Sequence, residues 1–149
     1  MCAYDETLLN KARFSMACMF DYAVYVVGMP LVEFYRLFLN STISEKFAYG
    51  DSSTVAGKSG SEIAYAVLKE KGIAFEFVFS TCIIDKSPEY WAGWVLAYYQ
   101  WLRNVSFKQI DEIIGIDDIV CMYRKYHEMD IEHFVIEIDR RRDEAKKEV

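Results

Sequence analysis

The sequence predicts an all-α fold: a single compact bundle of about six to eight helices around a central aromatic helix, with residues 1–149 forming one domain. Hydrophobic residues recur at helical spacing along most of the chain, and helix start and stop signals divide it into successive segments. Composition agrees, because 53% of the residues are hydrophobic while only seven are glycine and two are proline. Such a chain can bury a sizeable core.

Two helices are predicted before residue 40. Apolar residues recur with helical period from about residue 5 to residue 27, and Gly28 and Pro30 end this helix and open the next. The second helix spans Leu31 to Leu39, with its apolar side chains mostly on one side. Residues 41–59 are less regular. A short helix at residues 44–48 and turn signals around Gly50 and Gly57 indicate a loop that could face a partner.

A capping box of Ser59 and Glu62 predicts a helix that ends near Gly72, because each side chain can satisfy a free amide of the first turn. The following segment, Ile73 to Ile84, is ambiguous. Its phenylalanines alternate as in a strand, yet the sequence offers no second strand to pair with it. We favour a short helix, and pairing with the same segment of a second copy, as in a homodimer, stays open. The alternating residues are Phe75, Phe77 and Phe79.

The central helix is predicted from Pro88 to about Leu102 and holds all three tryptophans. Ser87 is suited to cap it, and proline suits its first position. It is apolar on all sides, which implies that neighbours pack around it. An aromatic stripe at helical spacing is more often core than pocket, so we expect its large members to be buried, with a ligand pocket as the alternative. They are Trp91, Trp94, Tyr98 and Trp101.

Three further helices are predicted after the central one. A second capping box at Ser106 opens a helix to about Ile114, and Gly115 turns the chain. A helix capped by Asp117 then runs to about His127. The last helix is capped by Asp130 and precedes a charged tail from residue 140 to residue 149.

Charge and cysteine usage favour a cytoplasmic protein without a membrane segment. The net charge of −6 disfavours attraction to nucleic acid or to an anionic membrane surface. The four cysteines form no C-x-x-C pair and are expected to be reduced thiols. Asp5 and Glu6 lie where a signal peptide would be basic, and no run of about 20 apolar residues could span a bilayer.

Three motifs suggest chemistry, and each has a simpler interpretation. Residues 57–59 (Gly-Lys-Ser) resemble the end of a phosphate-binding loop, but the first glycine of that pattern and the strand before it are absent, so a capping role for Ser59 fits better. His127 and His133 are six residues apart rather than four, which disfavours a helical zinc site, and no metal or cofactor is predicted.

The third motif is a helix-turn-helix-like arrangement across residues 106–127, but its second helix begins with Asp117 and Asp118, which repel phosphate. DNA binding is therefore the third-ranked alternative. No recognisable nucleophile motif is present, and two histidines supply little general-base material, so catalysis is not favoured.

The chain resembles a family of small uncharacterised bacterial proteins. The resemblance rests on the run from Glu89 to Trp101 (EYWAGWVLAYYQW) and on residues 126–131 (YHEMDI), with residues 57–60 and Glu62 also similar. It implies an association with operons that encode toxin-like ADP-ribosyltransferases, and hence an antitoxin or accessory role. It implies no activity and assigns no role to any residue.

The function that the sequence favours is therefore a non-catalytic protein-interaction module that binds another protein. Two exposed turns, residues 50–60 and 126–133, supply the candidate surfaces. The alternative is a small-molecule-binding or enzymatic domain whose pocket is lined by the four aromatics of the central helix, and a cavity beside them would favour it. The candidate partner-binding residues are Lys58, Ser59, His127, Glu128, Asp130 and His133.

Overall fold

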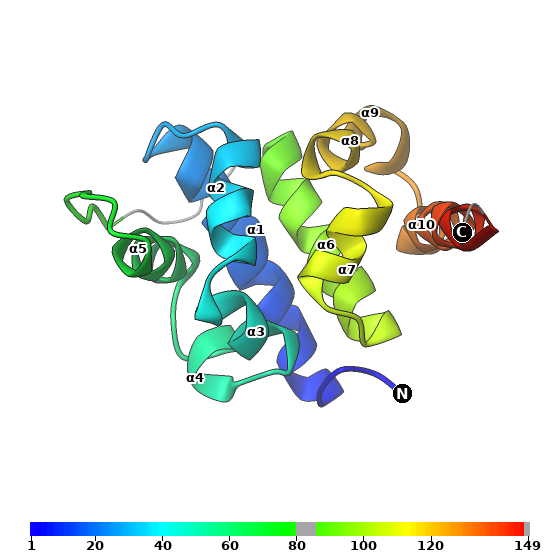
Figure 1. Ribbon diagram of the computed structural model, residues 1–149, viewed down its shortest axis with the longest axis horizontal. Helices are drawn as coiled ribbons and strands as arrows, with labels where there is room; N and C mark the ends of the chain where they lie inside the picture. Colours follow the sequence, from blue (N-terminus) through cyan, green and yellow to red (C-terminus); the bar gives the residue numbers. More distant parts are fainter. Residues whose placement is uncertain (80–85, 148–149) are drawn as a thin grey trace.

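A computed structural model describes residues 1–79 and 86–147, and within these ranges the chain is helical with no strand, which confirms the all-α class. The described residues contain ten α-helices rather than the expected six to eight (Figure 1). A short 3₁₀ turn over Glu6–Leu8 precedes the first. The helices are α1 (Leu9–Tyr25), α2 (Leu31–Leu39), α3 (Thr42–Ala48), α4 (Ser52–Val55), α5 (Gly60–Glu70), α6 (Pro88–Arg103), α7 (Phe107–Ile113), α8 (Ile116–Cys121), α9 (Tyr123–Tyr126) and α10 (Ile131–Lys147).

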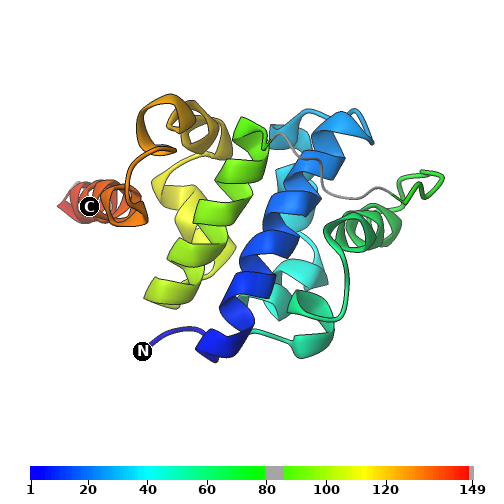
Figure 2. The ribbon, with the colours of Figure 1, turned by 180° about the vertical axis from the view of Figure 1, so that it is seen from behind.

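Helices α1 and α6 lie side by side at the centre of the molecule and make its most extensive helix pair (Figure 2). Gly93 is where they come closest. A Cβ atom on Gly93 would lie 2.6 Å from the backbone oxygen of Met16 and 2.8 Å from the Cα of Ala17. Any larger residue at position 93 would therefore push the two helices apart.

The remaining helices cover the two sides of this central pair. Helix α5 packs on α1, whereas α8, α9 and α10 gather on the side of α6 (Figure 1). The core between them is rich in fully buried aromatic rings, as the composition predicts. Phe38, Phe47 and Phe107 meet edge to face, with ring centroids 5.3 and 5.9 Å apart.

Most of the predicted helix boundaries are confirmed. Ser59 and Ser106 both form capping boxes, with Glu62 and Gln109 as their respective partners. Ser87 caps α6 by accepting from the amide of Tyr90, and its own hydroxyl donates to the Asp21 carboxylate at 2.6 Å. The central helix is thereby tied to α1 at its first turn.

The helix favoured for residues 73–84 is wrong over residues 73–79, which form neither helix nor strand; residues 80–84 lie outside the described residues. The rings of Phe75 and Phe77 both lie against Tyr22, with centroids 6.3 and 6.5 Å away. Residues two apart point to different sides of a helix, so this contact requires a non-helical backbone. The Tyr22 hydroxyl also accepts from the amide of Val78 and donates to its carbonyl.

Three smaller differences concern helix ends. The predicted loop around residue 52 contains the short helix α4. The helix predicted to be capped by Asp117 has Gly115 at its cap, so it begins two residues earlier, and it is split at Met122. The amide of Met122 donates to the carbonyls of both Asp118 and Ile119, a tightening that turns its side chain into the core.

The expected charged tail is instead helical as far as Lys147. Glu137 accepts from Arg140 and Arg141, and Arg140 also donates to Glu144, so side chains three and four residues apart are paired along α10. The two guanidinium groups hold the pKa of Glu137 at about 2.

The cysteines differ partly from the expectation of reduced thiols. Cys2 and Cys121 are free, but Cys18 in α1 is disulfide-bonded.

Candidate functional site

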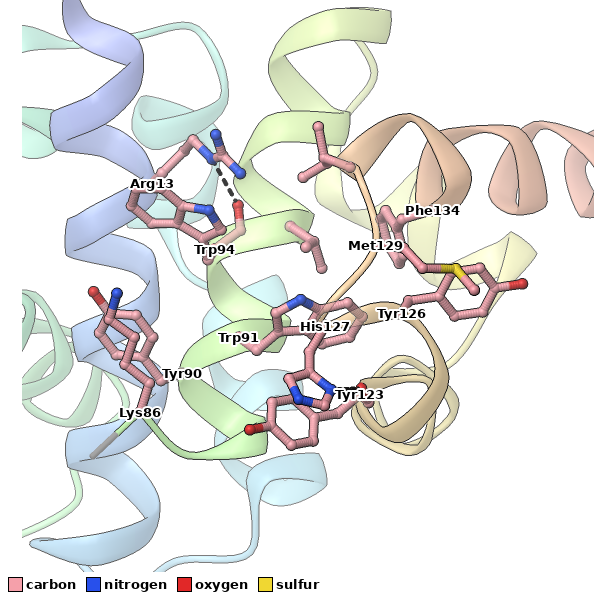
Figure 3. Close-up of a pocket in the computed structure, with 12 residues that line it drawn as sticks. Arg13, Lys86, Tyr90, Trp91, Trp94, Tyr123, Tyr126, His127, Met129 and Phe134 are labelled. Atoms are coloured by element: carbon pink, nitrogen blue, oxygen red, sulfur yellow. Dashed lines mark hydrogen bonds between the residues drawn. The ribbon is translucent and has the colours of Figure 1, made fainter.

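A cavity of about 380 Å³ opens between α6 and the segment that runs from α9 into α10 (Figure 3). Its walls are mostly aromatic. Tyr90, Trp91, Trp94 and Val95 come from α6; Tyr123, Tyr126, His127 and Met129 come from α9 and the following turn; Ile131 and Phe134 come from α10; and Arg13 and Lys86 complete the lining.

Trp91 joins the three elements around the cavity. Its ring lies edge to face with Tyr123 of α9 at 5.9 Å and with Phe134 of α10 at 5.7 Å between centroids. Such pairs favour one ring orientation through the positive edge and negative face of each ring. Trp91 is therefore held in one orientation at the wall of the cavity.

His127 lies at the front of the cavity in Figure 3, stacked on the Tyr123 ring with centroids 4.1 Å apart. Its Nδ1 is 2.6 Å from the carbonyl oxygen of Tyr123, an arrangement in which Nδ1 carries the proton and donates. Its Nε2 lies 3.7 Å from a carboxylate oxygen of Glu128. These contacts hold the imidazole in place one helical turn beyond Tyr123.

Arg13 of α1 lies over the indole of Trp94. Its guanidinium carbon is 4.1 Å from the Trp94 ring centroid and 4.9 Å from that of Tyr98, and its Nε donates to the Trp94 carbonyl at 3.1 Å. Burial lowers the pKa of Arg13 to about 10, with Tyr98 acting in the opposite direction. The side chain therefore stays protonated at neutral pH.

The charge of the cavity is opposite to that of the whole chain. The net charge is −6, yet the charged residues that line the cavity are Arg13 and Lys86, joined by the ionisable His127. No Asp or Glu is among the described lining residues. The site therefore combines an aromatic interior with a positive edge.

The four aromatics that the sequence singled out on α6 do not act as one group. Trp91 and Trp94 line the cavity, whereas Tyr98 lies beneath Arg13 outside the lining. Trp101 is only 7% exposed and donates its indole N–H to the carbonyl of Tyr4 at 2.8 Å.

The six candidate partner-binding residues fall on two separate parts of the molecule. Lys58 and Ser59 lie at the start of α5, on the far side of α1 from α10 (Figure 1). The other four lie in or just after the turn between α9 and α10, where Asp130 accepts from the amide of Glu132 at 3.0 Å. Of the six, His127 alone is among the described residues that line the cavity. The structure does not bring the two groups into one surface.

Sequence reasoning missed Arg13, Tyr123 and Phe134. Arg13 interrupts the apolar pattern of the first helix, and this was the available signal for its role. Tyr123 and Phe134 belong to ordinary helical apolar patterns, which do not distinguish a cavity wall from core.

In the described part of the chain, no group of three or more His, Cys, Asp or Glu side chains is arranged to hold a metal ion. Among the same residues, no helix has the length and apolar character needed to cross a membrane. No family model matches the chain, and neither curated proteins nor solved structures give a match. The fold and the cavity define the class, an all-α domain with an aromatic site.

Proposed function

We propose that this protein is a non-catalytic binding domain that holds a small molecule with an apolar, planar body in the cavity beside Trp91 and Trp94. The observation that carries the proposal is the cavity itself. Its volume of about 380 Å³ lies in the range of small-molecule sites, and its walls are aromatic with a few polar groups at the edge.

The cavity favours this function over the protein-interaction module as the leading hypothesis. The protein-interaction module requires the aromatic side chains of α6 to be buried, and Trp101 is buried. Trp91 and Trp94 are instead only partly buried and line the cavity, although full burial of such large apolar residues would stabilise the fold. A wall of positioned aromatic rings around a cavity is what a planar ligand requires.

The direct test is binding of a neutral fluorescent probe, N-phenyl-1-naphthylamine, whose emission rises in an apolar site. We expect saturable binding with one site per chain. Met129 lies at the cavity and is 43% exposed, so Met129→Trp adds bulk to the lining without emptying the core. This variant should bind the probe about 10-fold more weakly, because a filled cavity loses most of its contact area.

Ile136→Trp is the matched control. Ile136 is 65% exposed on α10, outside the cavity, and the substitution adds a similar bulk. It should leave probe affinity unchanged. Absence of saturable binding, or equal weakening by both variants, would contradict the proposed function.

A second candidate function, protein binding through self-association, rests on a different surface. Val78 and Phe79 follow the Tyr22 contact and are 52% and 69% exposed, which is unusual for two adjacent large apolar residues. We propose that this segment pairs with a second copy of the chain. This keeps the homodimer hypothesis that the alternating phenylalanines raised.

Light scattering coupled to size-exclusion chromatography checks the second function. The wild type should show twice the monomer mass at high protein concentration, and Val78→Glu should return it to the monomer. Lys108→Glu on α7 also places a glutamate at an exposed position, and it serves as the control. A monomer at every concentration would contradict self-association.

A cytoplasmic location is also a proposal, supported by the free thiols of Cys2 and Cys121. Differential alkylation and mass spectrometry of the protein from its native host decide the point. A reduced Cys18 supports the cytoplasm, and an oxidised Cys18 contradicts it.

A further inference from the structure

We propose that the cavity selects a small aromatic carboxylate, whose acidic group is bound by the terminal guanidinium nitrogens of Arg13 while its ring lies against Trp91 and Trp94. This inference rests on the proposed function and adds the chemical class of the ligand. It assigns the specificity of the site to a residue of α1 rather than to the aromatic helix.

The first argument is that Arg13 has no carboxylate partner. Among the described residues, Arg103 is paired with Asp139 at 2.6 Å, and Arg140 and Arg141 are both paired with Glu137. Arg13 forms no ion pair with any described residue, and its one hydrogen bond uses Nε. Both terminal nitrogens are left to donate to a ligand.

The second argument is burial. Arg13 is half-buried between two aromatic rings, where a charge loses part of its hydration. A half-buried cation without a counter-ion costs free energy, and a bound carboxylate would remove this cost by accepting two parallel hydrogen bonds. The lowered pKa of Arg13 has the same cause.

The third argument is that the guanidinium is already positioned. The Nε bond to the Trp94 carbonyl and the stack on Trp94 and Tyr98 fix its plane. Figure 3 shows the group above Trp94, at the edge of the aromatic cavity. A ligand therefore meets a prearranged donor pair and does not have to order a mobile side chain.

A cationic ligand is the main competing occupant, because aromatic cages also bind ammonium groups. The charges at this cavity disfavour it. Arg13 and Lys86 would both repel a cation, and no Asp or Glu is among the described lining residues to attract one. A carboxylate meets attraction from both basic residues.

The test compares two ligands that differ only in charge, naphthalene-2-carboxylate and naphthalene-2-carboxamide, each displacing N-phenyl-1-naphthylamine. The wild type should prefer the carboxylate by about 10-fold or more, as expected for hydrogen bonds to a charged group. Arg13→Met should abolish that preference, measured as the ratio of the two affinities, while the neutral probe still shows saturable binding. Arg13→Lys keeps the positive charge but not the planar guanidinium group, so it should retain part of the preference for the carboxylate that Arg13→Met loses.

Arg36→Met is the matched control, since Arg36 is exposed on α2 away from the cavity. It should retain the full carboxylate preference. Binding of the neutral probe without any carboxylate preference would overturn the charge assignment and leave the proposed function standing. Failure of the neutral probe to bind would overturn both.

Discussion

The two halves of α6 are both rich in aromatic residues but have different environments. Residues 88–95 carry two tryptophans that line a cavity, and residues 96–103 carry one that is buried. In the second half, the chain itself supplies hydrogen-bond partners to several polar atoms, although Gln100 Oε1 is buried without a partner among the described residues. The amide of Ala3 donates to the carbonyl of Trp101, and Gln100 Nε2 donates to the carbonyls of Ala48 and Val105.

The difference between the halves is due to what covers them. The N-terminal segment and the end of α3 lie over the second half, so Tyr99 and Trp101 are buried in the core. The first half faces two short helices and a turn, which leave space between Trp91 and the turn. An aromatic helix therefore becomes core or binding site according to its neighbours, and its composition alone does not decide.

Trp101→Ala should have the largest effect on stability and Trp94→Ala a clearly smaller one. Removal of a buried tryptophan costs about 3–5 kcal/mol of unfolding free energy, and the Tyr4 carbonyl loses its donor as well. Trp94 already faces a cavity and so loses fewer contacts. Chemical denaturation of the two variants checks this, and equal losses would show that the two halves are packed alike.

Gln100→Met should cost about 1 kcal/mol, because it leaves two carbonyl oxygens without the donor they share but also removes Gln100 Oε1, which is buried without a partner among the described residues. The shape of the side chain is nearly conserved, so packing changes little. Tyr98→Phe on the same helix is the control and should change stability by less than about 0.5 kcal/mol. A loss of unfolding free energy as small as that of the control would show that Gln100 does not stabilise the second half of α6.

Asp139→Asn should cost about 1 kcal/mol at neutral pH, since this carboxylate joins α10 to α6 through Arg103 and Tyr99. Burial acts to raise the pKa of Asp139, but the hydrogen bonds from Arg103 and Tyr99 outweigh it, and the net shift is downward. A lowered folded-state pKa means that the stabilisation is full above about pH 4 and is lost as the pH falls further.

Thermal melts of wild type and Asp139→Asn from pH 3 to pH 7 check this dependence. The difference between the two melting temperatures should shrink below about pH 4. A difference that stays constant over the whole range would contradict the ionic contribution of Asp139.

Trp91→Phe should have the smallest effect on stability, within about 1 kcal/mol, because a phenyl ring can keep part of the edge-to-face contact with Phe134. Its effect on the neutral probe should be larger, since the wall recedes. Fluorescence titration and thermal melting of the same sample separate the two effects. A strong loss of stability with unchanged binding would make Trp91 a core residue, like Trp101.

Much of the fold could be predicted because its signals are local. Capping boxes at Ser59 and Ser106, the Ser87 cap and the Gly28 stop each depend on residues within one helical turn. The segment 73–79 could not be assigned, since its conformation depends on Tyr22, more than 50 residues earlier. Tertiary contacts of this kind leave no local pattern.

The site was less predictable than the fold. The sequence pattern assigns Trp91 and Trp94, which line the cavity, to the alternative pocket. It also assigns Tyr98 and Trp101 to that pocket, by their spacing alone. Arg13 joins Trp91 and Trp94 only because α1 and α6 lie in contact. A single basic side chain within a mostly apolar helix forms no repeating pattern that would mark it as part of a site. The charge of a cavity is a property of several elements at once.

The contact at Gly93 sets the position of Arg13 as well as the packing of the core. Arg13 is one turn from Met16, and its bond to the Trp94 carbonyl joins the residue next to Gly93. The distance between the backbones of α1 and α6 therefore determines where the guanidinium group of Arg13 lies. A methyl group added at position 93 would push α1 and α6 apart, and it would thereby shift Arg13 relative to the Trp94 carbonyl.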